Sequence, residues 1–154
     1  MRVQLKDIVD SILSVYKLED GQLWIDIAGN DGYMLSQVPS NLIRINIDPS
    51  DDTFRVEAEK HCDLVIQDYF SADVFKKSKY GHLKPKVITT ISMFYDLSEP
   101  DKFLSDVYEV LDDDGLFVIQ LSYTPLMLEQ LEFMNLCHEH FFYYSLFNIK
   151  KHLC

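Results

Sequence analysis

The sequence predicts a single α/β domain, in which a mainly parallel sheet of about five strands lies between two layers of helices. Five short apolar runs alternate with helical patterns, which is typical of a parallel sheet that is buried on both faces. Right-handed crossovers between such strands give a doubly wound, Rossmann-like sheet. The 154 residues are enough for one hydrophobic core and few for two, so residues 1–154 are assigned to one domain.

The strands are predicted where an apolar run ends at a turn, a proline or an acidic residue. They are residues 23–28, 42–48, 63–67, 86–92 and 115–122. The helices are predicted where apolar residues recur every three to four positions or where a capping residue begins a segment. They are residues 3–18, 33–38, 52–60 (a short helix or turn), 72–79 after Ser71 as a cap, and a helix that begins at Ser98 as N-cap with Pro100 in its first turn.

The segment from residue 123 onward differs in composition from the rest. It is rich in aromatic residues and methionine, and its pattern is mostly helical. Its aromatic side chains are expected in the core or at a domain interface. They are Phe133, Phe141, Phe142, Tyr143, Tyr144 and Phe147.

Composition restricts the classes of function. The net charge of −11 disfavours nucleic acid as a partner, because binding to phosphates depends on basic residues, and it favours a small-molecule substrate. No apolar run reaches the roughly 18 residues that span a bilayer, and the first 20 residues lack the apolar core of a signal peptide. The default expectation is a cytoplasmic protein without membrane contact. Cys62, Cys137 and Cys154 are far apart, so neither a zinc site nor a disulfide framework is expected.

The loop after the first predicted strand, DIAGNDG (26–32), is the strongest indication of function. Gly29 and Gly32 allow a tight turn and the close approach of a ligand. The dinucleotide fingerprint GxGxxG is missing, and the carboxylates of Asp26 and Asp31 would repel a pyrophosphate, which prefers bare amides at a helix N-terminus. An acidic loop suits a ligand that carries an ammonium and a sulfonium group, and S-adenosylmethionine is such a ligand.

Two further acidic residues follow the next two strands. Asp48 ends the second strand roughly 20 residues after Asp26, where a carboxylate accepts hydrogen bonds from ribose hydroxyls. Asp68 follows the third strand, within reach of an adenine amine. Each Asp alone is typical of a solvated turn, but three at the ends of three successive strands favour a binding site. The predicted cofactor-binding residues are Asp26, Ala28, Gly29, Asn30, Asp31, Gly32, Asp48, Asp68, Tyr69 and Ser92.

The loop resembles the glycine motif of class I S-adenosylmethionine-dependent methyltransferases, acidic-x-Gly-x-Gly-x-Gly, with Ala28 and Asn30 in place of two glycines. In this narrower form it is similar to sugar C-methyltransferases that act on nucleotide-linked deoxyhexoses. The resemblance extends from about residue 23 to 147. It is most specific at QDYFSADVF (67–75), SMFYDL (92–97), DDDGLFVIQLSY (112–123) and CHEHFFYYSL (137–146).

The His138-Glu139-His140 run is the candidate for chemistry. It lacks the i, i+4 spacing of zinc proteases and a third ligand, so no metal is expected. The resemblance implies that His140 is a general base, that Glu139 orients it or binds substrate, and that Tyr123 lies nearby. Such a base would take the proton from a carbon beside a ketone, which then attacks a methyl group. The residues alone are equally consistent with histidines hydrogen-bonded in an aromatic core.

The resemblance implies a methyltransferase for small molecules, most specifically one that methylates a carbon of a keto-sugar nucleotide. A small-molecule O-methyltransferase and a non-catalytic cofactor-binding module remain as alternatives, whereas an NAD-dependent enzyme is disfavoured by Asp31 and the missing GxGxxG. Some relatives carry a histidine where this chain has Asp96, which is interpreted as an exposed turn residue.

Members of the resembled family usually carry a zinc-binding segment before this domain and another α/β domain after it. The chain shows neither, and it stops before the last strand pair of the methyltransferase sheet. A truncated fragment or a minimal homologue is therefore expected. A homodimer or a partner domain is expected to cover the open sheet edge.

Overall fold

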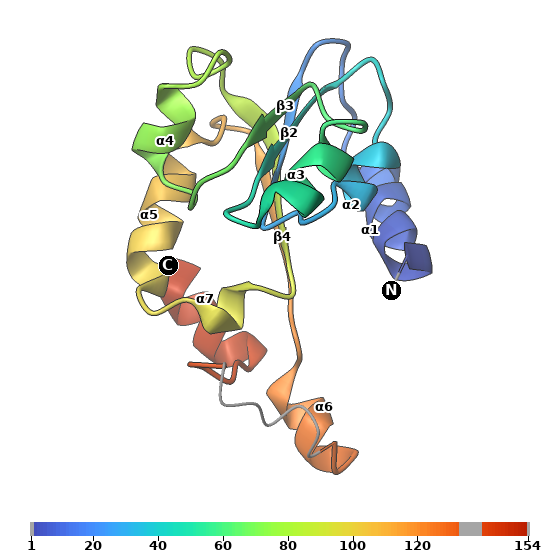
Figure 1. Ribbon diagram of the computed structural model, residues 1–154. Coiled ribbons are helices and arrows are strands. Elements are labelled where there is room, and N and C mark those ends of the chain that lie inside the picture. The colour runs from blue at the N-terminus through green and yellow to red at the C-terminus, as the bar shows by residue number, and fades with distance from the viewer. Residues whose placement is uncertain (1, 133–139, 154) are drawn as a thin grey trace.

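The computed structural model describes residues 2–132 and 140–153, and a five-stranded parallel sheet forms its centre (Figure 1). The strands are β1 (Leu23–Ile27), β2 (Ile43–Ile47), β3 (Leu64–Ile66), β4 (Pro85–Ile91) and β5 (Leu116–Gln120). Their order is β3-β2-β1-β4-β5, and each neighbouring pair is parallel. The predicted doubly wound α/β fold is confirmed, and each observed strand matches its predicted segment to within two residues at either end.

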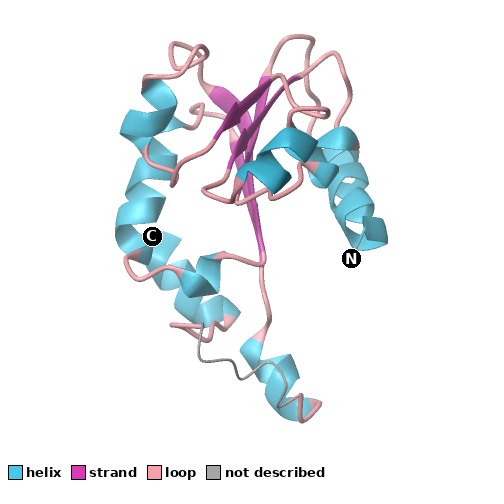
Figure 2. Cartoon of the chain, viewed as in Figure 1, coloured by secondary structure: helices cyan, strands magenta, loops and turns pink. Residues whose placement is uncertain are grey.

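Helices cover both faces of the sheet, as Figure 2 shows. The helices are α1 (Arg2–Val15), α2 (Tyr33–Ser36), α3 (Asp52–Ala58), α4 (Ala72–Lys76), α5 (Pro100–Val110), α6 (Thr124–Glu129) and α7 (Leu146–Leu153), and a 3-10 turn, η1, spans Phe94–Asp96. Helices α1, α2 and α3 lie on one side of the sheet, and α4, α5 and α7 lie on the other (Figures 1 and 2). This arrangement requires a sheet that is apolar on both faces, which the apolar runs of the sequence provide.

The core is correspondingly divided by the sheet. Trp24 of β1 packs with Val9 of α1 and Leu35 of α2 on one face. Ile25 of the same strand packs with Phe75 of α4 on the other face. Since successive residues of β1 point to opposite faces, this central strand joins both core layers and is buried along its whole length. The loop at its carboxyl end is therefore held on a rigid element.

The start of α5 differs from the sequence prediction. Ser71 caps α4 as predicted, accepting a hydrogen bond from the Val74 amide at 3.2 Å. Ser98, however, is not the cap of α5, and that prediction is wrong. The N-cap is Glu99, without a side-chain cap bond, and Pro100 is the first helical residue. The fixed φ of proline suits this position, because its missing amide hydrogen would have no partner in the first turn.

The aromatic segment near the C-terminus is much less buried than the sequence predicts. Tyr144 is in the core at 3% exposure, but Phe141, Phe142, Tyr143 and Phe147 are exposed by 66%, 39%, 39% and 69%. Phe133 lies outside the described residues. Helix α6, which follows β5, projects away from the body of the domain (Figure 1). A core position is wrong for these four rings, and an interface position remains a prediction.

Among the described residues, no helix combines the length and the apolar character that crossing a bilayer requires.

Candidate cofactor and active site

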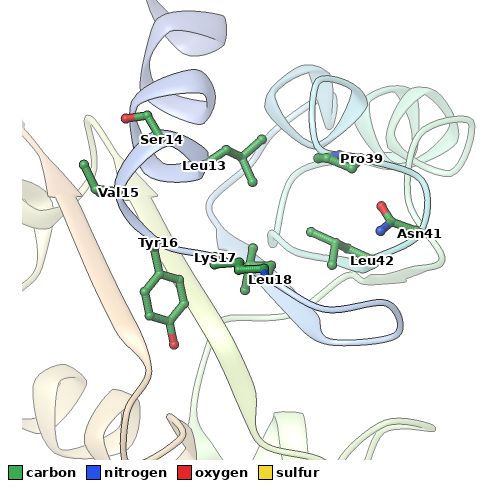
Figure 3. Close-up of a pocket in the computed structure, with 9 residues that line it drawn as sticks. All are labelled: Leu13, Ser14, Val15, Tyr16, Lys17, Leu18, Pro39, Asn41 and Leu42. Carbon is green, nitrogen blue, oxygen red and sulfur yellow. The ribbon is translucent and has the colours of Figure 1, made fainter.

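Two cavities lie at opposite ends of the sheet. One, of about 320 Å³, lies between the end of α1 and residues 39–42, where Tyr16 and Leu42 contribute to its wall (Figure 3). It is at the amino ends of the strands. The other, of about 580 Å³, is formed by the loops that follow β1, β2 and β4, with the first turns of α1. Because open α/β sheets bind ligands at the carboxyl ends of their strands, this second, carboxyl-end cavity is the candidate site.

The loop after β1 keeps the shape of a glycine-rich loop with only some of its glycines. The backbone φ angles of Ala28, Asn30 and Gly32 are 59°, 52° and 71°, and these are the three glycine positions of the methyltransferase motif. Left-handed backbone is accessible to Asn and unfavourable for Ala, so neighbouring groups must hold it. The Ala28 amide donates to the Ile47 carbonyl at 2.9 Å, and the Asn30 amide donates to Asp48 Oδ2 at 2.8 Å.

Gly29 has a different role from the predicted one. Its φ is not positive, so the turn itself does not require a glycine there. A β-carbon on Gly29 would stand 2.5 Å from Asn46 Oδ1 and 2.7 Å from Asp26 Oδ2. The glycine is therefore needed because the loop passes directly over two buried polar side chains.

Asp26 is buried beneath this loop. The residue is 2% exposed, and its Oδ1 accepts a hydrogen bond of 2.6 Å from the Thr89 hydroxyl. The Trp24 indole donates in turn to that hydroxyl at 3.2 Å. Burial raises the pKa of Asp26 to about 7, and the charge of Asp48 adds to this rise, whereas the bond from Thr89 opposes it. The result is a carboxyl group that titrates near neutral pH at the wall of the cavity.

Asn46 was not predicted as a site residue. It stands opposite Asp26 in the register of β1 and β2, is fully buried, and donates from Nδ2 to the Asn30 carbonyl at 3.0 Å. The signal in the sequence was an amide inside the apolar run LIRINID (42–48). A buried amide in a central strand needs hydrogen-bond partners, and here the cofactor loop supplies one.

Carboxylates surround the cavity. Asp48, 7% exposed, accepts from the Asn30 amide through Oδ2 and from the Ser50 amide through Oδ1 at 2.7 Å. Asp31 accepts from the Tyr33 amide at 3.1 Å. Together with Asp26 and Asp96, these residues give the lining four acidic side chains, and such a lining attracts a cationic ligand.

Helix α1 contributes to the cavity as well, which sequence reasoning did not predict. Gln4 and Leu5 form part of its wall. Arg2 lies 4.0 Å from Asp31 and 4.6 Å from the centre of the Tyr33 ring. The polar face of an N-terminal helix gave no signal of this position, because the sequence does not show toward which loop the helix points.

A smaller, mostly apolar cavity of about 220 Å³ adjoins the first. Pro49, Met93 and Asp96 belong to both walls, and Tyr69, 77% exposed, stands at its rim. Asp68 is exposed, accepts from the amide of its own neighbour Tyr69 at 2.7 Å, and lines neither cavity. Its predicted contact with the adenine amine stays a prediction.

Two residues after β4 lie at the cavity. Ser92, with a φ of 56°, donates from its hydroxyl to Gln120 Oε1 at 2.8 Å, which ties the loop to β5. Asp96, which was interpreted as a turn residue without a role, is exposed and contributes to both cavity walls. That interpretation is incomplete, because Asp96 shares these walls with Ala28 of the loop after β1.

Of the predicted catalytic residues, His140 and Tyr123 are described, and neither is in the wall of these two cavities. The His140 ring is 4.2 Å from the Tyr95 ring, centre to centre, and the amides of residues 141 and 142 both donate to the Tyr95 carbonyl. Tyr123, 47% exposed, forms a β-bridge with Tyr144. Glu139 lies outside the described residues. Residues 140–144 thus attach His140 to η1, the turn that also carries Asp96.

Within residues 2–132 and 140–153, no group of three or more His, Cys, Asp or Glu side chains is arranged to hold a metal ion.

Comparison with known proteins identifies the family. The sequence profile described as a methyltransferase domain matches residues 1–153. The chain belongs to this family. Among curated proteins, C-methyltransferase NovU of Streptomyces niveus is 25% identical over 143 residues, which cover 92% of this chain and 34% of the relative. The chain therefore spans about a third of the length of that relative.

Solved methyltransferase structures have the same fold. The plantazolicin methyltransferase BpumL, in complex with a pentazolic desmethylPZN analogue and S-adenosylhomocysteine, matches with a TM-score of 0.70 at 16% identity, over 99% of this chain and 62% of that one. A Haloferax volcanii methyltransferase in complex with the Trm112 activator matches with a TM-score of 0.71 at 15% identity, over 98% of this chain and 69% of that one. The expected class I methyltransferase fold is confirmed.

Proposed function

We propose that this domain binds S-adenosylmethionine in the carboxyl-end cavity and takes part in methyl transfer to a small molecule. The observation that carries the proposal is the acidic lining of this cavity, with Asp26, Asp31, Asp48 and Asp96 around about 580 Å³ at the switch point of a parallel sheet. The family membership and the S-adenosylhomocysteine complex of BpumL support it.

The residues present fit the parts of this cofactor. Asp26 lines the cavity and suits an ammonium group, and behind it lies Asn46 Oδ1, a buried acceptor without a partner among the described residues. Asp48 is fixed by two backbone amides and has remaining acceptor capacity for ribose hydroxyls. The adjoining apolar cavity, beside Pro49 and Tyr69, suits a flat adenine.

A dinucleotide fits this site less well. Asp48 Oδ2 already accepts the Asn30 amide, and Asp31 Oδ1 accepts the Tyr33 amide. These are the loop amides that a pyrophosphate would otherwise use. A diphosphate would therefore meet carboxylates at the positions where it needs amide donors.

For the chemistry we propose C-methylation of a keto-sugar nucleotide, in line with the resemblance and with NovU, which is named a C-methyltransferase. Bound S-adenosylmethionine would supply an electrophilic methyl group. His140 would accept the proton from the carbon beside the ketone, with Glu139 and Tyr123 near it. This carbon would then form the new bond to the methyl carbon as the sulfur–methyl bond breaks, and the electron pair of that bond would leave with the sulfur as a neutral thioether. The attachment of His140 to η1, beside Asp96 at the cavity, supports this role.

O-methylation is the second candidate, because Asp96 contributes a carboxylate to both cavities and could accept the proton of a hydroxyl group. The site of methylation in the product separates the two reactions.

The test is transfer of an isotope-labelled methyl group from S-adenosylmethionine to a panel of keto-sugar nucleotides. We expect a C-methylated product, and we expect that His140→Ala lowers kcat by about 10²-fold or more while cofactor binding is retained. The matched control is His82→Ala, an exposed histidine before β4 at the far end of the sheet. An unchanged rate for His140→Ala contradicts the assignment of the base, and cofactor binding without turnover supports a non-catalytic module.

We also propose that a second copy of the chain or another domain covers the β5 edge. The outer residues of β5 are only half-buried. Large apolar side chains are exposed in the following segment, Leu126, Leu128, Leu131, Leu146 and Phe147 among them. Exposed strand edges beside apolar surface are typical of interaction sites.

A further inference from the structure

Two side-chain oxygen atoms, both hydrogen-bond acceptors, face one point below the cofactor loop: Asn46 Oδ1, which is buried, and Oδ2 of Asp26, a residue of the cavity wall. This point is where a β-carbon on Gly29 would stand, 2.5 Å from Asn46 Oδ1 and 2.7 Å from Asp26 Oδ2. The strand register places Asp26 and Asn46 side by side on neighbouring strands. Asn46 is fully buried, and its Oδ1 has no hydrogen-bond partner among the described residues.

The orientation of the Asn46 amide follows from its other contact. Nδ2 donates to the Asn30 carbonyl at 3.0 Å. The flipped amide would bring two carbonyl oxygens together, so Oδ1 must face the Asp26 side. Asp26 uses its Oδ1 to accept the Thr89 hydroxyl, which leaves Oδ2 toward Asn46. A buried acceptor such as Asn46 Oδ1 is unfavourable without a hydrogen to accept, and a protonated Asp26 Oδ2 is the neighbouring group that can supply one.

We propose that Asp26 is protonated in the ligand-free protein and donates this hydrogen to Asn46 Oδ1, and that a cationic ligand group displaces it. The proton then leaves to solvent, and the ammonium of the ligand pairs with the carboxylate of Asp26, which lines the cavity. Asn46 is thus a positioning residue, which holds Asp26 in its neutral form and supports the loop at Asn30. The exchange rests on the proposed function only for the identity of the ligand, because the protonated state belongs to the ligand-free chain.

The surroundings of Asp26 favour the neutral acid. Desolvation raises the pKa of its carboxyl group to about 7, and Asp48 at the end of β2 raises it further. Cys62, after α3, also interacts with Asp26, and burial raises the pKa of this thiol to about 12, so it stays uncharged. The groups from β4 and α1 that face the site, Thr89, Gln4 and Leu5, do not titrate. No basic side chain appears among the groups that shift Asp26.

The first test uses the ligand-free chain. A carbon-13 NMR titration of the Asp26 carboxyl group, assigned by its loss in Asp26→Asn, is expected to show a midpoint near 7. Asn46→Ala is expected to lower this midpoint, because the acceptor is lost and water can enter. Asp26→Asn should fold, since its amide can donate to Asn46 Oδ1 as the protonated acid does. A midpoint near the ordinary value of 3.8 in the unmodified chain would overturn the proposal.

The second test measures the proton that leaves. Calorimetry with S-adenosylhomocysteine, which carries the ammonium but no sulfonium, is run in buffers that differ in ionisation enthalpy. With a pKa near 7, binding is expected to release about 0.9 proton at pH 6 and about 0.1 at pH 8, with roughly tenfold weaker binding at pH 6. Asp26→Asn is expected to lack this release. Binding without proton release at pH 6 overturns the exchange, whereas a failure of S-adenosylhomocysteine to bind overturns the proposed function and leaves the NMR result valid.

Discussion

At the scale of single residues, the raised pKa of Asp26 couples folding to pH. The folded chain keeps a proton on this carboxyl group up to about pH 7, whereas the unfolded chain loses it near 3.8. The folded state therefore binds more protons between these values, so the free energy of unfolding falls as the pH rises through this window. This contribution is fully present below about pH 4 and is lost above pH 7.

Replacing Asp26 by Asn is expected to remove this loss, because an amide keeps a neutral donor in place of the acid. Urea unfolding at pH 5 and pH 8 measures this effect. The free energy of unfolding of Asp26→Asn, relative to that of the unmodified chain, should be higher at pH 8 than at pH 5. Asp113→Asn, in a side chain that is 94% exposed and paired with Lys84, is the control and should keep the original slope. Identical slopes for Asp26→Asn and the unmodified chain would show that Asp26 is ionised in the folded state.

At the scale of the element, the loop after β1 shows that a lack of space for a β-carbon and a left-handed backbone are two different reasons for a glycine. Gly29 has ordinary backbone but no space for a β-carbon, whereas Ala28 carries its β-carbon on a left-handed backbone. Gly29→Ala should lower the free energy of unfolding by about 1–3 kcal/mol through overpacking against Asn46 and Asp26. Ala28→Gly should leave it unchanged or raise it by up to about 1 kcal/mol, because glycine relieves the left-handed strain.

Chemical denaturation of both variants measures these changes. Gly21→Ala is the reference for backbone strain alone, since Gly21 has a φ of 78° and a β-carbon added there would have no atom within 4 Å. Its cost should be about 1 kcal/mol. If Gly29→Ala costs no more than Gly21→Ala does, the close packing below the loop is not as tight as described.

Strands and helices that are marked by an apolar run or a capping residue were predictable from the sequence. The tertiary contacts of these elements were not. Apolar runs such as LWIDIA (23–28) indicated the strands, and Ser71 indicated a helix start. Ser98 failed as a cap because Pro100 two residues later determines where α5 begins. Asn46 and Gln4 reach the site only through strand register and helix direction. These depend on tertiary packing, which no local pattern encodes.

The acidic residues that follow the strands show the same dependence on tertiary structure. Asp26 and Asp48 were predictable, because a residue at the end of a parallel strand has its position fixed by the sheet. Asp68 comes two residues after the end of β3, one residue further than Asp48 from β2, and accepts from the amide of Tyr69. A single residue of offset in a loop changes where a side chain points, and the sequence gives no measure of that offset.

At the scale of the whole molecule, the open β5 edge and the apolar surface that follows it predict self-association. The isolated chain, 18.0 kDa as a monomer, should sediment as a larger species at micromolar concentration. Phe147→Asp, in a side chain that is 69% exposed, should shift it toward the monomer, whereas Val56→Asp, 50% exposed on α3 at the β2–β3 side of the sheet, should not. A monomer at every concentration would contradict a homodimer.

Binding of S-adenosylmethionine, measured by calorimetry beside NAD⁺, tests the central claim most directly. The acidic cavity predicts binding of one S-adenosylmethionine per chain and none of NAD⁺. It also predicts that Asp48→Ala weakens binding by about 10- to 100-fold, as the loss of hydrogen bonds to a charged group implies, while Asp113→Ala leaves it unchanged. An absence of S-adenosylmethionine binding, or binding that Asp48→Ala does not weaken, would contradict this assignment of the site.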